Sequence, residues 1–67
     1  MKFETFGLNV ARQRIKRNIS AYEFSLRVGK DPSYMSKLEN GKINPSLKMI
    51  IAIANEFNID IRDLFVE

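Results

Sequence analysis

Helix start and stop signals follow one another closely between residues 20 and 41, and this spacing restricts the possible folds. Ser20 and Glu23 have the form of a capping box, in which the serine hydroxyl accepts from the Glu23 amide and the carboxylate reaches back. Gly29 suits the left-handed conformation of a helix exit. Asp31–Pro32 can then start another helix, which Asn40–Gly41 would end. The sequence therefore predicts two short, steeply crossing helices joined by a tight turn.

The rest of the chain shows apolar residues at helical spacing and no alternation with a period of two. We expect a first helix over about Glu4–Arg17, a fourth helix between Asn44–Pro45–Ser46 and Asn58, and a last short helix capped by Asp60. The prediction is an all-α protein, a compact five-helix bundle in a single domain of residues 1–67. Its expected core consists of the apolar residues at helical spacing: Phe6, Val10, Phe24, Val28, Met35, Leu38, Leu47, Ile50, Ile53, Ala54, Phe57, Leu64 and Phe65.

The composition argues against several classes of function. The chain has no cysteine and no histidine, which removes disulfides, thiolate metal sites and the commonest general base. No apolar run approaches the roughly 20 residues that span a bilayer, and the N-terminus lacks a signal-peptide pattern. We therefore expect a soluble cytoplasmic protein that is not an enzyme. No metal, cofactor, small-molecule ligand or membrane partner is expected.

Charge is distributed unevenly along the chain. Residues 1–48 contain ten lysines and arginines against four acids, a net charge of +6, whereas residues 49–67 contain one arginine against four acids, a net charge of −3. One interpretation is an ordinary solvated surface. The other is a protein that meets phosphates with one side only.

Several stretches of the chain carry a resemblance to a known family. They are Phe6–Gly7 with Val10 and Arg14, Ile19–Ser20 with Glu23–Phe24, Val28–Gly29, the run from Pro32 to Lys42, Asn44 to Leu47, and Asp60 to Phe65. Together they resemble the Cro/repressor (Xre-type, lambda-repressor-like) helix-turn-helix family over about nine-tenths of the chain. The resemblance implies a small transcriptional regulator of bacterial, archaeal or phage origin, a repressor more often than an activator. It would bind double-stranded DNA sequence-specifically through the major groove.

The same resemblance implies which residues meet DNA. The helix that follows Asp31 would lie in the major groove, with its outward residues against the bases: Pro32, Ser33, Ser36 and Lys37. Phosphates would be contacted by Arg14, Ser20, Tyr34, Asn40, Lys42 and Ser46. Two alternatives stay open: Lys37 as a phosphate contact or a solvated lysine, and Tyr34 as a ring half-buried against the preceding helix.

Arg14 and Glu39 match positions that form a structural ion pair in the family, tying the first helix to the recognition helix. Three positions depart from the family pattern. Ala21 stands where relatives often have a phosphate-binding glutamine, Ser25 replaces the usual alanine, and Lys30 replaces an apolar residue in the turn. We expect Lys30 to bury only its aliphatic stem.

The family also implies a homodimer on a palindromic operator, because one helix-turn-helix buries little DNA surface. We expect such a dimer to use the acidic C-terminal part near Ile59, Ile61 and Phe65. The alternative for these side chains is ordinary scattered apolar exposure. A different class of function is an adaptor module for protein partners, but an adaptor would favour an apolar rather than a basic recognition helix.

Overall fold

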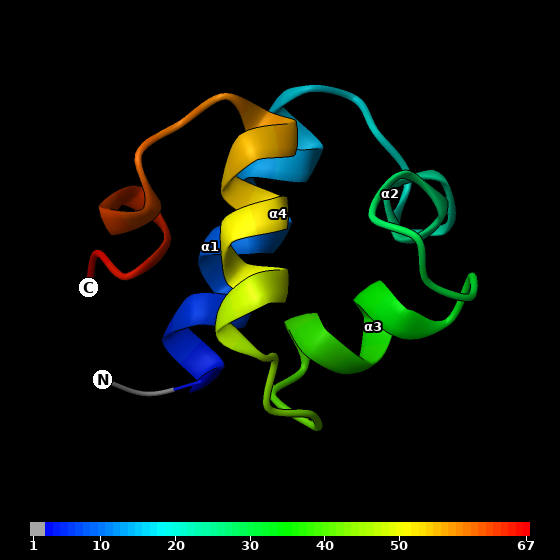
Figure 1. Ribbon diagram of the computed structural model, residues 1–67, viewed down its shortest axis with the longest axis horizontal. Helices are drawn as coiled ribbons and strands as arrows, with labels where there is room; N and C mark the ends of the chain where they lie inside the picture. Colours follow the sequence, from blue (N-terminus) through cyan, green and yellow to red (C-terminus); the bar gives the residue numbers. More distant parts are fainter. Residues whose placement is uncertain (1–2) are drawn as a thin grey trace.

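The computed structural model describes residues 3–67, and these fold into helices without any strand. Figure 1 shows α1 and α4 side by side in the middle, with α2 and α3 on one flank and the C-terminal segment on the other. The elements are α1 (Phe3–Lys16), α2 (Ala21–Arg27), α3 (Tyr34–Glu39), α4 (Leu47–Phe57) and the 3-10 helix η1 (Ile61–Leu64). The all-helical prediction is confirmed, but the count is four α-helices and one 3-10 turn within the described residues, rather than five α-helices.

The last element is a 3-10 helix rather than an α-helix, as its backbone hydrogen bonds show. The Asp63 amide donates to the Asp60 carbonyl at 2.9 Å, an i to i+3 bond, and the Phe65 amide donates to the Arg62 carbonyl at 3.0 Å. Asp60 caps this turn, as predicted, since its Oδ1 accepts from the Arg62 amide at 2.9 Å.

Serine hydroxyls cap two of the α-helices. Ser20 Oγ accepts from the Glu23 amide at 3.0 Å, and Ser46 Oγ accepts from the Met49 amide at 3.1 Å. The expected capping box is only half formed, because the Glu23 carboxylate pairs with Arg27 one turn along α2 instead.

The start of α3 differs from the prediction. The α-helix begins at Tyr34 rather than at Asp31–Pro32. Asp31 Oδ1 accepts from the Ser33 amide at 2.9 Å and from Ser33 Oγ at 2.6 Å, so residues 31–33 form a side-chain-stabilised turn ahead of the helix. Asp31 therefore caps this turn, and the N-cap residue Ser33 gives α3 no side-chain hydrogen bond.

Ten buried apolar side chains from all five elements form the core: Phe6, Val10, Phe24, Met35, Leu38, Ile50, Ile53, Ala54, Phe57 and Leu64. Three other side chains were expected in the core: Val28 and Phe65 pack against it but are only partly buried, and Leu47 is exposed. Phe24 stacks on Phe57 with ring centroids 4.4 Å apart, joining α2 to α4. Arg17 lies over the other side of this pair, 4.8 Å from the Phe57 ring, and donates to the Phe57 carbonyl at 3.0 Å. That contact ties the end of α1 to the end of α4.

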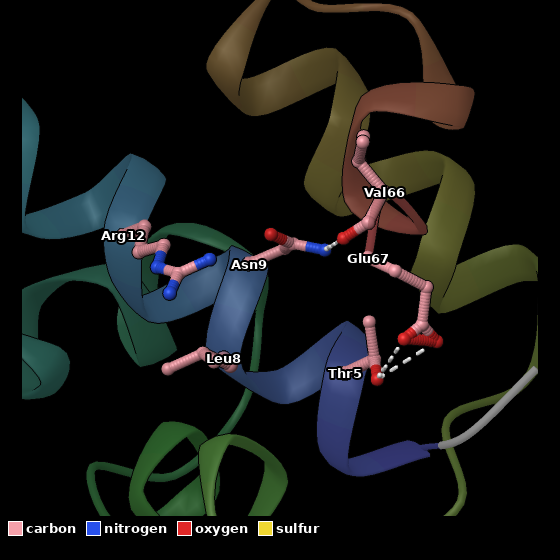
Figure 2. Close-up of a pocket in the computed structure, with 6 residues that line it drawn as sticks. All are labelled: Thr5, Leu8, Asn9, Arg12, Val66 and Glu67. Atoms are coloured by element: carbon pink, nitrogen blue, oxygen red, sulfur yellow. Dashed lines mark hydrogen bonds between the residues drawn. The ribbon is translucent and has the colours of Figure 1, made fainter.

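Asn9 attaches the C-terminal segment to α1. Its buried Nδ2 donates to the Leu64 carbonyl at 3.1 Å and to the Val66 carbonyl at 2.8 Å, the second of which is drawn in Figure 2. Beside this contact a half-open pocket of about 140 Å³ lies between α1 and the chain end, lined by Thr5, Leu8, Asn9, Arg12, Val66 and Glu67.

Gly7 lets the end of α3 approach α1 at backbone distance. A Cβ atom at this position would lie 2.6 Å from the Leu38 carbonyl oxygen and 2.8 Å from the Glu39 carbonyl oxygen. Backbone atoms cannot move aside cheaply, so the helix-interior glycine is required by packing, despite its cost in helix propensity.

Candidate nucleic-acid interface

The outward face of α3 and the turn before it is polar and exposed. Met35 and Leu38 point into the core, which leaves the four residues expected to meet bases on the opposite, solvent-facing side. These are Pro32, Ser33, Ser36 and Lys37, and all four are exposed. The structure therefore brings the expected base-contacting residues together on one surface.

The expected phosphate-contacting residues lie mostly at the ends of elements around α3. Ser20, Asn40, Lys42 and Ser46 are exposed. The hydroxyls of Ser20 and Ser46 each accept from a helix amide, so each still has its proton to donate to a phosphate oxygen. Asn40 uses part of its amide differently, since Nδ2 donates to the Ser36 carbonyl at 2.7 Å and closes α3.

Tyr34 is partly buried, and its ring packs against the core. Burial raises the pKa of the Tyr34 phenol above its ordinary value, so the hydroxyl stays protonated and remains a hydrogen-bond donor. The Lys30 ammonium lies 5.3 Å from the ring centroid, a cation–π distance. Lys30 therefore extends across the tyrosine, with its side chain exposed on the same surface.

Arg14 and Glu39 meet in a bidentate ion pair at the back of α3. Arg14 Nε donates to Glu39 Oε2 at 2.8 Å and Nη2 donates to Oε1 at 3.0 Å, while Nη1 donates to the Ile19 carbonyl at 2.9 Å. The side chains are only 15% and 11% exposed. The hydrogen bond to Glu39 raises the pKa of Arg14 further, although burial opposes the rise. The pair holds the end of α3 against α1, and leaves Arg14 two N–H groups for any phosphate.

The electrostatics of this surface favour an anionic partner. Four exposed lysines lie between residues 30 and 48, and none forms an ion pair within the described part of the chain: Lys30, Lys37, Lys42 and Lys48. The two acids of the same stretch have partners, Asp31 in its bonds from Ser33 and Glu39 in its pair with Arg14. The surface is therefore basic in its structure as well as its composition.

Three residues of this region were not among the predicted site residues. Lys48, in the first turn of α4, adds a cation next to Ser46. Gly7 and Ser25 contact α3 from α1 and α2. The sequence held a signal for both, because glycine inside a helix and a polar residue on an apolar helix face each require a packing explanation.

The C-terminal residues expected at a dimer interface are only partly exposed to solvent. Ile59, Ile61 and Phe65 are partly buried and pack against the core, and Phe65 stacks on Phe6 at 5.3 Å. On α4, Leu47 and Ile51 are more exposed, at 68% and 44%, and are spaced one turn apart.

No helix in residues 3–67 has the length and apolar character to cross a membrane. The same residues contain no cluster of three or more acidic side chains arranged to hold a metal ion. The pocket in Figure 2 lies against the C-terminal segment, and none of its lining residues belongs to α2, α3 or the turn between them.

Comparison with known proteins yields consistent matches. The family profile described as helix-turn-helix matches residues 10–64. Two HTH-type transcriptional regulators of Archaeoglobus fulgidus are 43% and 40% identical over 53 residues, which cover 79% of this chain and 75% and 76% of theirs. The restriction-modification controller protein C.AhdI from Aeromonas hydrophila superposes with a TM-score of 0.86 and 30% identity, covering 94% of this chain and 91% of that one. The clp gene regulator ClgR from Corynebacterium glutamicum shares the fold, with a TM-score of 0.88 and 19% identity, covering 96% of this chain and 68% of that one.

Proposed function

Because this chain belongs to the Cro/repressor type of the helix-turn-helix family and is a DNA-binding transcriptional regulator, we propose that it reads a specific operator with α3 in the major groove. One observation carries this proposal: Lys37 on the exposed face of α3, with Lys30 and Lys42 on either side of the helix, forms no ion pair within residues 3–67, while both neighbouring acids are already bonded within the protein. Lys37 would donate to O6 and N7 of a guanine, with Ser33 and Ser36 beside it.

Phosphate contacts would position the reading face of α3, that is, Ser33, Ser36 and Lys37. Lys42, Asn40 and Ser46 flank α3 on one side, and Ser20 stands at the exposed start of α2. Helix starts offer backbone amides to phosphate oxygens, so α4 would contribute amides as well as Ser46. Tyr34 would donate its phenol to a phosphate, and Arg14 would contribute through the N–H groups that Glu39 and Ile19 leave free.

The proposal includes a homodimer on a palindromic site, since one α3 reads too few base pairs for a tight specific complex. Ile59, Ile61 and Phe65 would contribute their exposed portions to the interface. The exposed Ile51 of α4 is an additional candidate. This arrangement suits the charges, because the C-terminal segment is acidic and the basic face stays free.

We propose repression rather than activation as the mode of regulation, as the family resemblance implies. It would act in the cytoplasm, where the DNA is, and without catalysis. The acids of the helix-turn-helix side have structural partners, in the Asp31 turn and the Arg14–Glu39 pair, and the chain offers no histidine or cysteine as a base or nucleophile.

Selection of binding sites from random duplexes, repeated at several salt concentrations, tests the function. We expect a palindromic consensus with an affinity that falls steeply with salt. Equal affinity for every sequence would reduce the function to non-specific binding, and absence of binding at low salt would refute it.

A matched pair of lysine variants tests the assigned contacts. Lys37→Ala should relax the preference at one base pair per half-site and cost about 1–3 kcal/mol of binding free energy on the selected site. Lys42→Ala should weaken binding to all sequences alike and lower the salt slope by about one. Both are measured by fluorescence anisotropy on the selected duplex and single-base variants. If Lys37→Ala weakened every duplex equally, Lys37 would be a phosphate contact.

A further inference from the structure

The contacts of Ser25 point to a role in aiming the recognition helix. We propose that Ser25 is a positioning residue: its buried hydroxyl on α2 caps α3 in place of the missing local cap and so fixes where the reading face lies. The DNA part of this inference rests on the function proposed above, whereas the capping part does not.

The first turn of α3 lacks an adequate cap of its own. The first amides of any α-helix have no partner inside the helix and need one elsewhere. Ser33, the N-cap residue, makes no side-chain hydrogen bond to α3, because its hydroxyl and amide both donate to Asp31 Oδ1. With six residues, α3 has few internal bonds to compensate for this.

Ser25 supplies the missing acceptor from a different helix. The Met35 amide, in the first turn of α3, donates to Ser25 Oγ at 3.0 Å. The hydroxyl can donate its one proton to the Ala21 carbonyl at 2.9 Å or to the Pro32 carbonyl at 3.3 Å, and the shorter bond anchors it within α2. One oxygen thus links the α2 backbone to the α3 backbone.

Burial makes this bond hard to replace. Ser25 and Met35 are both 0% exposed, so water cannot reach the Met35 amide unless α2 and α3 separate. A buried amide without a hydrogen-bond partner is energetically costly, so small movements that give it a partner become favourable. Without the Ser25 hydroxyl, we expect the first turn of α3 to loosen or shift.

The two ends of α3 are therefore held by different contacts. The Arg14–Glu39 pair and the close approach at Gly7 hold its C-terminal end against α1. Ser25 holds its N-terminal end against α2. Ser36 and Lys37 follow directly after the amide that Ser25 binds, so a shift at Met35 displaces both side chains from the bases.

The test uses the intact chain with Ser25→Ala and Ser25→Cys. Alanine is the usual residue here in the family that the sequence resembles, so the first variant should fold while losing the hydroxyl. Cysteine retains a side chain but offers only a weak acceptor. Ile53→Val, a buried change in α4, is the control for a loss of stability that leaves α3 alone.

Two readouts are needed. Amide hydrogen exchange by NMR reports the cap without DNA: we expect the Met35 amide to exchange faster in Ser25→Ala, less so in Ser25→Cys, and unchanged in Ile53→Val. Affinity for the selected duplex and for a shuffled duplex of equal length reports the positioning. At a temperature where every variant is folded, Ser25→Ala should lose about 10-fold on the selected duplex and almost nothing on the shuffled one.

An unchanged Met35 exchange rate in Ser25→Ala would overturn the cap. Equal losses on both duplexes, or no loss despite faster exchange, would overturn the positioning role. If the unmodified protein does not distinguish the duplexes, the proposed operator reading fails and the positioning role fails with it, but the exchange measurement still decides the cap.

Discussion

The two flanks of the molecule are held in place by different balances of polar and apolar contacts. On the helix-turn-helix side, Phe24 packs α2 on α4, but α3 is fixed by directional polar contacts, the Arg14–Glu39 pair to α1 and the Ser25 hydroxyl to α2. On the C-terminal side, Leu64 is fully buried and Phe65 stacks on Phe6, and the Asn9 amide adds hydrogen bonds to two backbone carbonyls. Figure 1 shows these flanks on opposite sides of the central helices.

The difference follows from how much apolar surface each flank can bury. A short helix with one face turned to solvent buries only Met35 and Leu38. Apolar contacts are non-directional, so two such side chains stabilise α3 without fixing its orientation. Hydrogen bonds have narrow geometry and fix it. We infer that the C-terminal flank mainly provides stability and the helix-turn-helix flank mainly provides orientation.

The largest expected effect is on the C-terminal flank. Leu64→Ala should lower the free energy of unfolding by about 4 kcal/mol, because it leaves a cavity under a fully buried side chain. Urea titration measures the loss. In the fraction that remains folded, the ratio of affinities for selected and shuffled DNA should not change. A changed ratio would show that this flank also orients α3.

On the other flank, Glu39→Gln should lower the free energy of unfolding by about 2–3 kcal/mol. This is less than for a fully buried pair, because the side chains keep 15% and 11% exposure and glutamine can still accept from Arg14. Specific DNA affinity should fall as well. The matched control is Glu23→Gln in the exposed pair with Arg27, with an expected cost of about 0.5 kcal/mol or less. An unchanged melting temperature and operator affinity for Glu39→Gln would contradict this role.

The smallest effect concerns the acidic cap on each flank. Hydrogen bonds from the Ser33 hydroxyl and amide lower the pKa of Asp31 below its ordinary value of 3.8, and bonds from Arg62 lower the pKa of Asp60. Because folding lowers these pKa values, each carboxylate cap stabilises the folded state at any pH above the pKa of the unfolded chain. This stabilisation is lost as the pH falls through the lower pKa of the folded state.

NMR titration of the Ser33 and Arg62 amides should therefore show both midpoints below 3.8. Added salt should raise the Asp60 midpoint more, because its partner is a cation and that of Asp31 is neutral. Asp31→Asn keeps an acceptor and should abolish the acid transition at Ser33. A midpoint at the ordinary value would contradict the bonds at that carboxylate.

Most of the fold followed from local sequence signals. Ser20 and Asp60 cap helices as expected, α4 starts directly after Asn44–Pro45–Ser46 as expected, and Asn58 closes it in the left-handed conformation with a φ of 57°. Gly29 has a φ of 79° at the corner before α3. Such signals are readable because a cap or a glycine exit depends on neighbours within a few residues.

What the sequence did not reveal depends on competition and on distant contacts. Asp31 was expected to cap α3, but its carboxylate accepts a hydrogen bond from the Ser33 hydroxyl, two residues later, instead. The Glu23 carboxylate pairs with Arg27 instead of accepting from the amide at the start of α2. The small side chain of Ser25 was expected where α2 and α3 meet, but the hydrogen bond that its hydroxyl accepts from the Met35 amide was not. The contact of Gly7 with the end of α3 joins residues far apart in the sequence, and helical periodicity carries no information about such pairs.

The side chains of the reading face are unequally tied to the framework. Ser33 is bonded to Asp31, but no side-chain hydrogen bond or ion pair within residues 3–67 involves the Ser36 hydroxyl or the Lys37 ammonium. Selection can therefore exchange residues 36 and 37 without disturbing the scaffold, whereas residue 33 is constrained by the turn. Under the proposed function, substitutions at these two positions would change the contacts to the bases while the fold stays the same, so a change of operator preference would begin there.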